Sequence, residues 1–116
     1  MLIRCAFFEG RVKPGCDDAF AKFVRERLVP LWTKFPGAEE VRVLRQAQSD
    51  TEEPHYAMVL SIAYPDMAAM ELALASDVRT QSRIETGELV KMFEGRIFHT
   101  VFDVLHGTTQ VISQRL

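Results

Sequence analysis

The sequence predicts an α+β fold, a four-stranded antiparallel sheet in the ferredoxin-like, split β-α-β order of strand, helix, strand, strand, helix, strand. Two observations lead to this prediction. Stretches rich in β-forming residues occupy 2–12, 38–48, 55–64 and 95–105. Helix-forming segments separate the first stretch from the second and the third from the fourth. With 116 residues, of which 47% are hydrophobic, we expect a single domain spanning 1–116.

The segment 55–64, HYAMVLSIAY, is the predicted centre of the sheet. Side chains alternate along a strand, so one side would carry Tyr56, Met58, Leu60, Ile62 and Tyr64. The other side would carry small or apolar residues, so neither side is typical of a surface in contact with water. A strand that is apolar on both faces needs cover on both.

The first strand, 2–12, ends at a Lys-Pro-Gly turn, and a helix follows it. Apolar residues at three-and-four spacing mark one face of this helix: Phe20, Phe23, Val24, Leu28, Leu31 and Phe35. Pro30 removes one backbone hydrogen bond and is expected to kink the last turns. Pro36 and Gly37 then end the helix.

In the second strand, 38–48, Val41 and Val43 are predicted on one side, with Arg42 and Leu44 on the other. A polar loop over 46–54 leads to the central strand.

Residues 66–76 are strong helix formers whose expected buried stripe is Met67, Met70, Ala73 and Leu74. The next segment, 77–93, is more polar, and we expect Gly87 to interrupt it. The last strand, 95–105, is again apolar on both sides. The tail 107–116 contains Val111 and Ile112, which favour a role at a sheet edge or across a partner.

Right-handed crossovers would place both helical regions on the same face of the sheet. The opposite face would then be an apolar patch larger than a monomer normally exposes. Packing two such faces together removes both from water, so the sequence predicts a homodimer through the sheet face.

The sequence resembles the dimeric α+β barrel superfamily and, within it, EthD-like proteins over nearly the whole chain. Three motifs carry the likeness: Lys13-Pro14-Gly15 with Asp18-Ala19-Phe20; Leu28-Val29-Pro30-Leu31 with Phe35-Pro36-Gly37; and Tyr64-Pro65-Asp66-Met67-Ala68 with Leu72-Ala73-Leu74-Ala75-Ser76. Leu28 stands where EthD-like sequences typically have a histidine. The resemblance implies a pocket between sheet and helices or within the barrel. By this resemblance, the relatives of the chain within the superfamily include cofactor-free monooxygenases, haem-degrading enzymes, lactone isomerases and polyketide cyclases.

Composition argues against several classes of function. A net charge of −2 disfavours nucleic acid, and the apolar stretches are far shorter than the roughly 20 residues that span a membrane. Cys5 and Cys16 lack metal-ligand spacing and suggest a reducing cytoplasm, as does the absence of a signal-peptide pattern. The scattered histidines and isolated glycines show neither a zinc motif nor a phosphate loop, so no metal or other cofactor is predicted.

His99 is the best candidate catalytic residue, because it is a titratable group inside an apolar strand. Asp103 lies on the same side of that strand, roughly 13 Å away at about 3.3 Å per residue, too far for a hydrogen-bonded pair. Arg4 and Cys5 belong to the neighbouring strand, so either could approach His99. A Cys5–His99 nucleophilic pair would need both side chains on one face.

Arg4, Arg42, Tyr56, Ser61 and Asp103 are the candidate ligand-binding residues. The first hypothesis is a small-molecule-binding protein, either an oxygenase or an isomerase without a cofactor, acting on an aromatic or otherwise apolar compound. The alternatives are a non-catalytic ligand-binding or accessory protein and a purely structural module. Fold alone does not choose among them.

Overall fold

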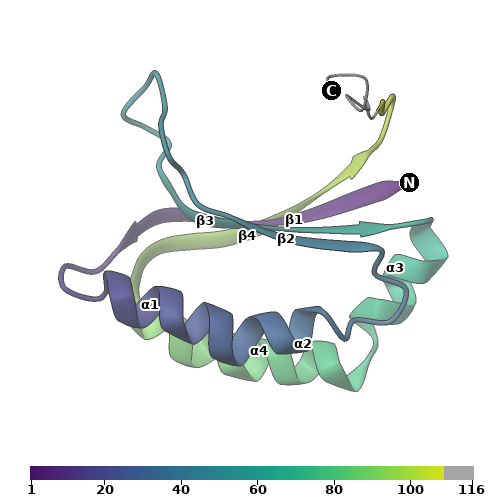
Figure 1. Ribbon diagram of the computed structural model, residues 1–116, viewed down its shortest axis with the longest axis horizontal. Coiled ribbons are helices and arrows are strands. Elements are labelled where there is room, and N and C mark those ends of the chain that lie inside the picture. Colours follow the sequence, from purple (N-terminus) through teal and green to yellow (C-terminus); the bar gives the residue numbers. More distant parts are fainter. Residues whose placement is uncertain (109–116) are drawn as a thin grey trace, which may run out of the picture.

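The structure is a computed structural model that describes residues 1–108. Figure 1 shows two layers, a twisted sheet and a layer of helices that covers one face of it. The elements, in chain order, are β1 (Leu2–Val12), α1 (Asp17–Phe23), the π-helical η1 (Val24–Leu28), α2 (Val29–Trp32), β2 (Glu40–Leu44), β3 (Tyr56–Tyr64), α3 (Met67–Leu74), α4 (Asp77–Leu89), the short 3-10 helix η2 (Val90–Met92) and β4 (Phe93–Asp103).

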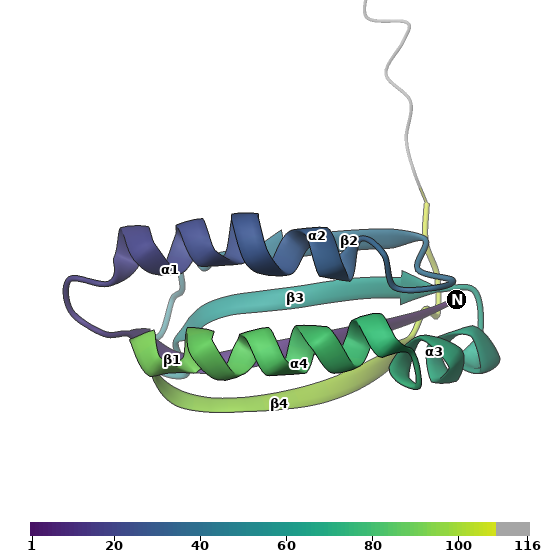
Figure 2. The same ribbon diagram turned by 90° about the horizontal axis from the view of Figure 1, so that it is seen from below.

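The sheet has the strand order β2-β3-β1-β4, and each neighbouring pair is antiparallel. Helices α1–α2 and α4 lie on the same face of the sheet (Figures 1 and 2). The predicted α+β, ferredoxin-like fold class is therefore confirmed, including the position of β4 beside β1.

The strand boundaries depart from the sequence prediction mainly at β2. This strand covers only Glu40–Leu44, because the polar residues that follow it leave the sheet as a loop. Strand β4 begins at Phe93, two residues earlier than expected, and ends at Asp103. The prediction for the tail 107–116 concerns residues that lie largely outside the described part.

A register irregularity on β1 and β3 changes the face of one predicted site residue. Phe8 pairs with Met58, but Glu9 pairs with Tyr56, so β3 has one extra residue, Ala57. The predicted alternation therefore holds from Met58 to Tyr64 and fails at Tyr56. The Tyr56 ring lies 5.6 Å from the ring of Phe7, on the face away from the helices.

The first helical region accommodates Pro30 with a wider, π-helical turn before it. Proline cannot donate a backbone hydrogen bond, and its ring clashes with the carbonyl four residues earlier in an α-helix. Here the turn before it, Val24–Leu28, is π-helical, and Pro30 lies at the start of α2. Of the predicted apolar face, Phe20, Val24, Leu28 and Phe35 are buried, whereas Phe23 and Leu31 are half-buried; Trp32 is buried as well.

The second helical region consists of α3 and α4. Met70 and Ala73 of α3 are buried, whereas Met67, predicted in the same stripe, is 48% exposed. The predicted interruption at Gly87 is wrong, because α4 continues through this residue to Leu89. Asp66 and Ser76 cap the two helices by accepting hydrogen bonds from the backbone N–H groups of Ala69 and Arg79.

The core lies between the sheet and the helices and is filled mainly from β1, β3 and α1–α2. Its fully buried members include Leu28, Tyr64, Ala73 and Leu89. None of the described helices is long and apolar enough to cross a membrane.

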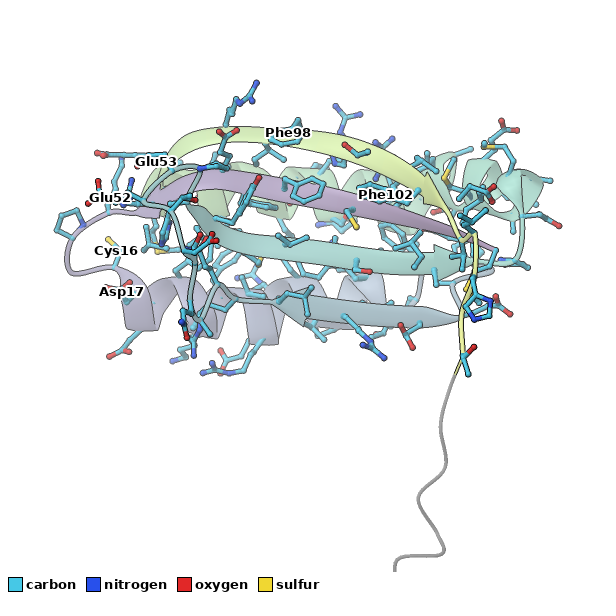
Figure 3. The ribbon with its side chains drawn as sticks, turned by 90° about the horizontal axis from the view of Figure 1, so that it is seen from above. Cys16, Asp17, Glu52, Glu53, Phe98 and Phe102 are labelled. Carbon is cyan, nitrogen blue, oxygen red and sulfur yellow. The ribbon has the colours of Figure 1, made fainter. Side chains whose placement is uncertain are left out.

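The other face of the sheet carries no helix, and we call it the open face (Figures 1 and 3). Phe7 is its aromatic centre, with the rings of Phe98 and Phe102 at 5.1 and 6.4 Å. Phe102 is 47% exposed and Leu44 49%. The loop between β2 and β3 extends to this side of the sheet, as Figure 1 shows.

Candidate functional site

Helix α4 covers the sheet with a polar stripe. Arg79, Ser82, Arg83 and Thr86 follow the spacing of one helical face, and all four line a cavity against the sheet. Ile84, the one large apolar residue in the middle of this helix, is instead 61% exposed. A helix that packs on a sheet normally buries its apolar stripe, and here polar side chains leave a cavity between the helix and the sheet instead.

We call this cavity the α4 pocket. Its volume is about 430 Å³, within the range of small-molecule sites. Figure 2 shows the elements that surround it, with α4 beside α1–α2 and strand β4 at the edge of the sheet beyond α4. The lining residues are Arg4, Ala6, Phe8, Trp32, Phe35, Leu60, Ile62, Tyr64, Arg79, Ser82, Arg83, Thr86, Ile97 and His99.

The pocket has an apolar side and a polar side. Phe8, Leu60 and Ile62 of the sheet are buried, as are Trp32 and Phe35 beside α4. Ala6, the small residue at the centre of β1, leaves space between them. An apolar wall faced by a few polar groups is the usual construction of a site for an organic molecule.

The sheet register brings Arg4 and His99 to the same side of the pocket. His99 pairs with Ala6, and Arg4 pairs with Val101, so the two are diagonal neighbours on adjacent strands. Such neighbours are roughly 7–8 Å apart. His99 is exposed at the edge strand, whereas Arg4 is half-buried between β3 and β4.

The pocket disfavours a proton on His99. Although the residue as a whole is exposed, partial burial of its ring against the pocket is the main cause, and the guanidinium groups of Arg4, Arg79 and Arg83 add to it, so the pKa of His99 falls to about 4. Its imidazole is therefore neutral at pH 7. Burial likewise lowers the pKa of Arg4 and of Arg79.

Tyr64 places its ring in the pocket wall and is only 1% exposed. Burial raises the pKa of its phenol, although Arg4 and Arg79 act in the opposite direction. Tyr64 remains a neutral hydrogen-bond donor near two cations.

The positive charge of the pocket has no counterion within residues 1–108. The salt bridges of this part of the chain involve Arg11, Arg27, Arg42, Lys91 and Arg96. The guanidinium of Arg79 donates to the backbone carbonyl of Leu74 at 3.3 Å, which is a neutral acceptor.

The remaining predicted ligand-binding residues lie elsewhere. Arg42, Tyr56 and Ser61 are on the open face, where Arg42 pairs with Glu40 at 2.9 Å. Asp103 pairs with Leu2 at the end of β4 and does not line the α4 pocket. Of the predicted site residues, the structure places only His99 and Arg4 in one pocket.

The sheet register separates Cys5 from His99. Cys5 pairs with Thr100 and Ser61, and its side chain is on the open face. His99 pairs with the next residue, Ala6, and is on the face that the helices cover. A Cys5–His99 nucleophilic pair is therefore excluded within one chain. Burial raises the pKa of the Cys5 thiol, although a hydrogen bond with Ser61 lowers it in part. Within residues 1–108, histidine, cysteine and carboxylate side chains do not cluster in threes suited to a metal ion.

Sequence reasoning missed Tyr64, Arg79, Ser82, Arg83 and Thr86. The signal for the last four was present in their helical spacing. A search for apolar stripes overlooks a helix whose inward face is polar.

Comparisons with known proteins establish the fold. No protein-family model matches the sequence, and no curated protein matches it. Among solved structures, a protein of the EthD (ethyl tert-butyl ether D) family from Bacillus halodurans C-125 has a TM-score of 0.69 and 19% identity, covering 90% of this chain and 99% of its own.

Two further structures give similar values. An antibiotic biosynthesis monooxygenase has a TM-score of 0.62 and 19% identity, covering 91% of this chain and 100% of its own. A variant of SnoaB, a cofactor-independent oxygenase from Streptomyces nogalater, has a TM-score of 0.65 and 16% identity, covering 94% and 97%. The chain thus shares its α+β fold with these structures, among them a protein of the EthD family that the sequence resembles.

Proposed function

We propose that the α4 pocket binds a small aromatic or otherwise apolar organic compound. The observation that carries this proposal is the reversed helix α4, which turns polar side chains toward the sheet and leaves Ile84 on the outside. A flat ring system would pack against Trp32 and Phe35, with its polar atoms toward α4.

Filling the pocket tests this proposal. Thr86→Phe places a ring on the inward face of α4, and Thr80→Phe, on an exposed turn of the same helix, is the matched control. Binding of naphthoate and of naphthamide to each protein would be measured by calorimetry. Thr86→Phe should abolish binding and Thr80→Phe should leave it unchanged. Equal binding by both variants would refute the proposal.

A chemical step is the second part of the proposal. SnoaB, which shares the fold, is a cofactor-independent oxygenase, and a comparable oxygenation or isomerisation here would begin with removal of a proton from the bound compound. His99 is the candidate base, because its imidazole is neutral and lines the pocket. Turnover of candidate quinols that is unchanged by His99→Gln would remove this residue from the mechanism.

A non-catalytic ligand-binding protein is the alternative, and one observation favours it. A base works best when its pKa is near the operating pH, and a pKa of about 4 makes His99 a weak base in the empty pocket. Tight binding without turnover of any candidate quinol would support this alternative over catalysis.

We also propose that two copies associate through the open face. Its aromatic centre around Phe7 and the exposed Phe102 and Leu44 would form the apolar middle of the interface. Figure 3 shows Phe98 and Phe102 on this face. Phe102→Glu should produce monomers in sedimentation experiments, whereas Leu72→Glu, at a 69% exposed position on α3, should not. A wild-type protein that is monomeric at micromolar concentration would contradict the dimer.

We further propose that the protein is cytoplasmic, forms a single domain and has neither a nucleic acid nor a membrane partner. Cys5 and Cys16 are both free thiols, which suits a reducing compartment.

A further inference from the structure

We propose that the ligand of the α4 pocket is an organic anion, a planar apolar molecule whose carboxylate, phenolate or enolate oxygen is held by Arg4 and Arg79. This inference rests on the proposed function and specifies the chemical class of the ligand. It comes from the distribution of charge around the pocket.

The pocket collects three cations although the chain as a whole has a net charge of −2. Arg4 comes from β1, and Arg79 and Arg83 from consecutive turns of α4. Like charges four residues apart on a helix repel one another, and burial adds a further cost for Arg4 and Arg79. These costs destabilise the protein while the pocket is empty, and a bound anion would offset them.

The protein itself does not supply that negative charge within residues 1–108. Elsewhere on the surface arginines pair with carboxylates at 2.8 to 2.9 Å, as in the pairs of Arg11 with Glu53 and Arg96 with Glu9. The polar partners near the pocket cations are instead neutral, namely the phenol of Tyr64, the imidazole of His99 and backbone carbonyls.

The donors around the pocket suit an oxygen anion. A guanidinium donates in a planar fork that fits a carboxylate, and the phenol of Tyr64 supplies another donor from β3. Beside Arg4 on the same face of the sheet, Phe8 and Ile62 offer an apolar surface to the body of the ligand, and Trp32 adds to it from the helical layer. Inorganic phosphate would satisfy the donors and leave the apolar wall in water, so the site fits an anion with a carbon skeleton.

Calorimetric titration with matched probes tests the inference. Naphthoate, naphthamide and inorganic phosphate separate the charge from the ring, and a phenolate probe, dinitrophenolate, separates carboxylates from other oxygen anions. We expect naphthoate to bind roughly 10- to 100-fold more tightly than naphthamide, the gain typical of charge-assisted hydrogen bonds. Phosphate should bind more weakly than either.

Arginine substitutions assign the effect to the pocket. Arg4→Gln and Arg79→Gln should each remove most of the preference for naphthoate and leave naphthamide binding within about threefold. Arg11→Gln, which removes an equal charge from an exposed residue outside the pocket, should retain the preference. Circular dichroism of each variant establishes that it is folded.

The outcomes separate the two proposals. Equal affinity for naphthoate and naphthamide, with both lost in Thr86→Phe, would overturn the proposal of an anionic ligand. The proposal that the α4 pocket binds an organic compound would stand. A preference for naphthoate that survives Arg4→Gln and Arg79→Gln would also overturn it. Binding of neither ring compound to the wild-type protein would overturn both proposals, and tighter binding of phosphate than of naphthoate would replace the organic anion with an inorganic one.

Discussion

Two helical regions cover the same face of one sheet in opposite ways. The region from α1 to α2 turns Phe20, Val24, Leu28 and Trp32 inward, and all four are buried. Along its middle turns, helix α4 instead directs arginine, serine and threonine toward the sheet and exposes Ile84, and it buries Leu89 at its C-terminal end. The first region closes the core and provides stability, while the middle turns of the second bury less apolar surface and leave a lined cavity.

The largest expected effect comes from a substitution in the buried face of the region from α1 to α2. Leu28 is fully buried, so Leu28→Ala should lower the free energy of unfolding by about 2–5 kcal/mol. Ile84→Ala, the same kind of truncation on the exposed side of α4, should change it by no more than about 0.5 kcal/mol. Urea denaturation measures both. Similar losses for the two variants would mean that α4 is packed like α1–α2.

The free energy of unfolding of the protein should rise when a cation is removed from the α4 pocket. Arg4→Met keeps an unbranched apolar stem in place of a half-buried cation, so the free energy of unfolding without ligand should rise by about 0.5–2 kcal/mol. Arg11→Met, at an exposed salt bridge, should have little effect. A loss of stability in Arg4→Met would show that Arg4 has a structural role and would weaken the comparison.

Gly87 offers a smaller gain on the same helix. A methyl group at this position would meet no atom within 4 Å beyond the adjoining residues and the backbone of its own helix, and the backbone there is ordinary α-helix. Gly87→Ala should therefore raise the free energy of unfolding by about 0.5–1 kcal/mol, with ligand affinity unchanged. Denaturation and titration of one preparation test both statements, and a destabilised variant would place the helix boundary before Gly87.

The pH dependence of stability should reveal the lowered pKa of His99, which burial and then the nearby cations cause. Its pKa is about 4 in the folded protein and near 6.5 when unfolded, so the unfolded chain binds more protons between these values. The contribution of His99 to stability is therefore complete above about pH 6.5 and is lost as the pH falls toward 4. His99→Gln should lose less stability than the wild type between about pH 7 and pH 5. Identical losses would contradict the lowered pKa.

The sequence predicted the parts of this structure that depend on regular patterns. Apolar spacing located the helix that carries Leu28, and β-forming stretches located the strands. Predictions from these patterns failed where a local irregularity interrupts the alternation of side chains along a strand. The extra residue beside Tyr56 moved that side chain to the open face, and no residue type in the sequence marks the position.

The candidate site was only partly accessible from sequence, for a different reason. His99 stood out as a polar residue in an apolar strand, and Arg4 followed from strand order. Arg79 and Arg83 looked like residues of a solvated helix, because sequence alone does not say which side of α4 meets the sheet.

The central claim is that α4 encloses a site for an organic anion, and a crystal structure with naphthoate tests it most directly. We predict density for the ring between α4 and the sheet, beside Trp32, with the carboxylate within hydrogen-bonding distance of Arg4 or Arg79. Density for the ring outside the α4 pocket, or a carboxylate directed to solvent, would contradict it.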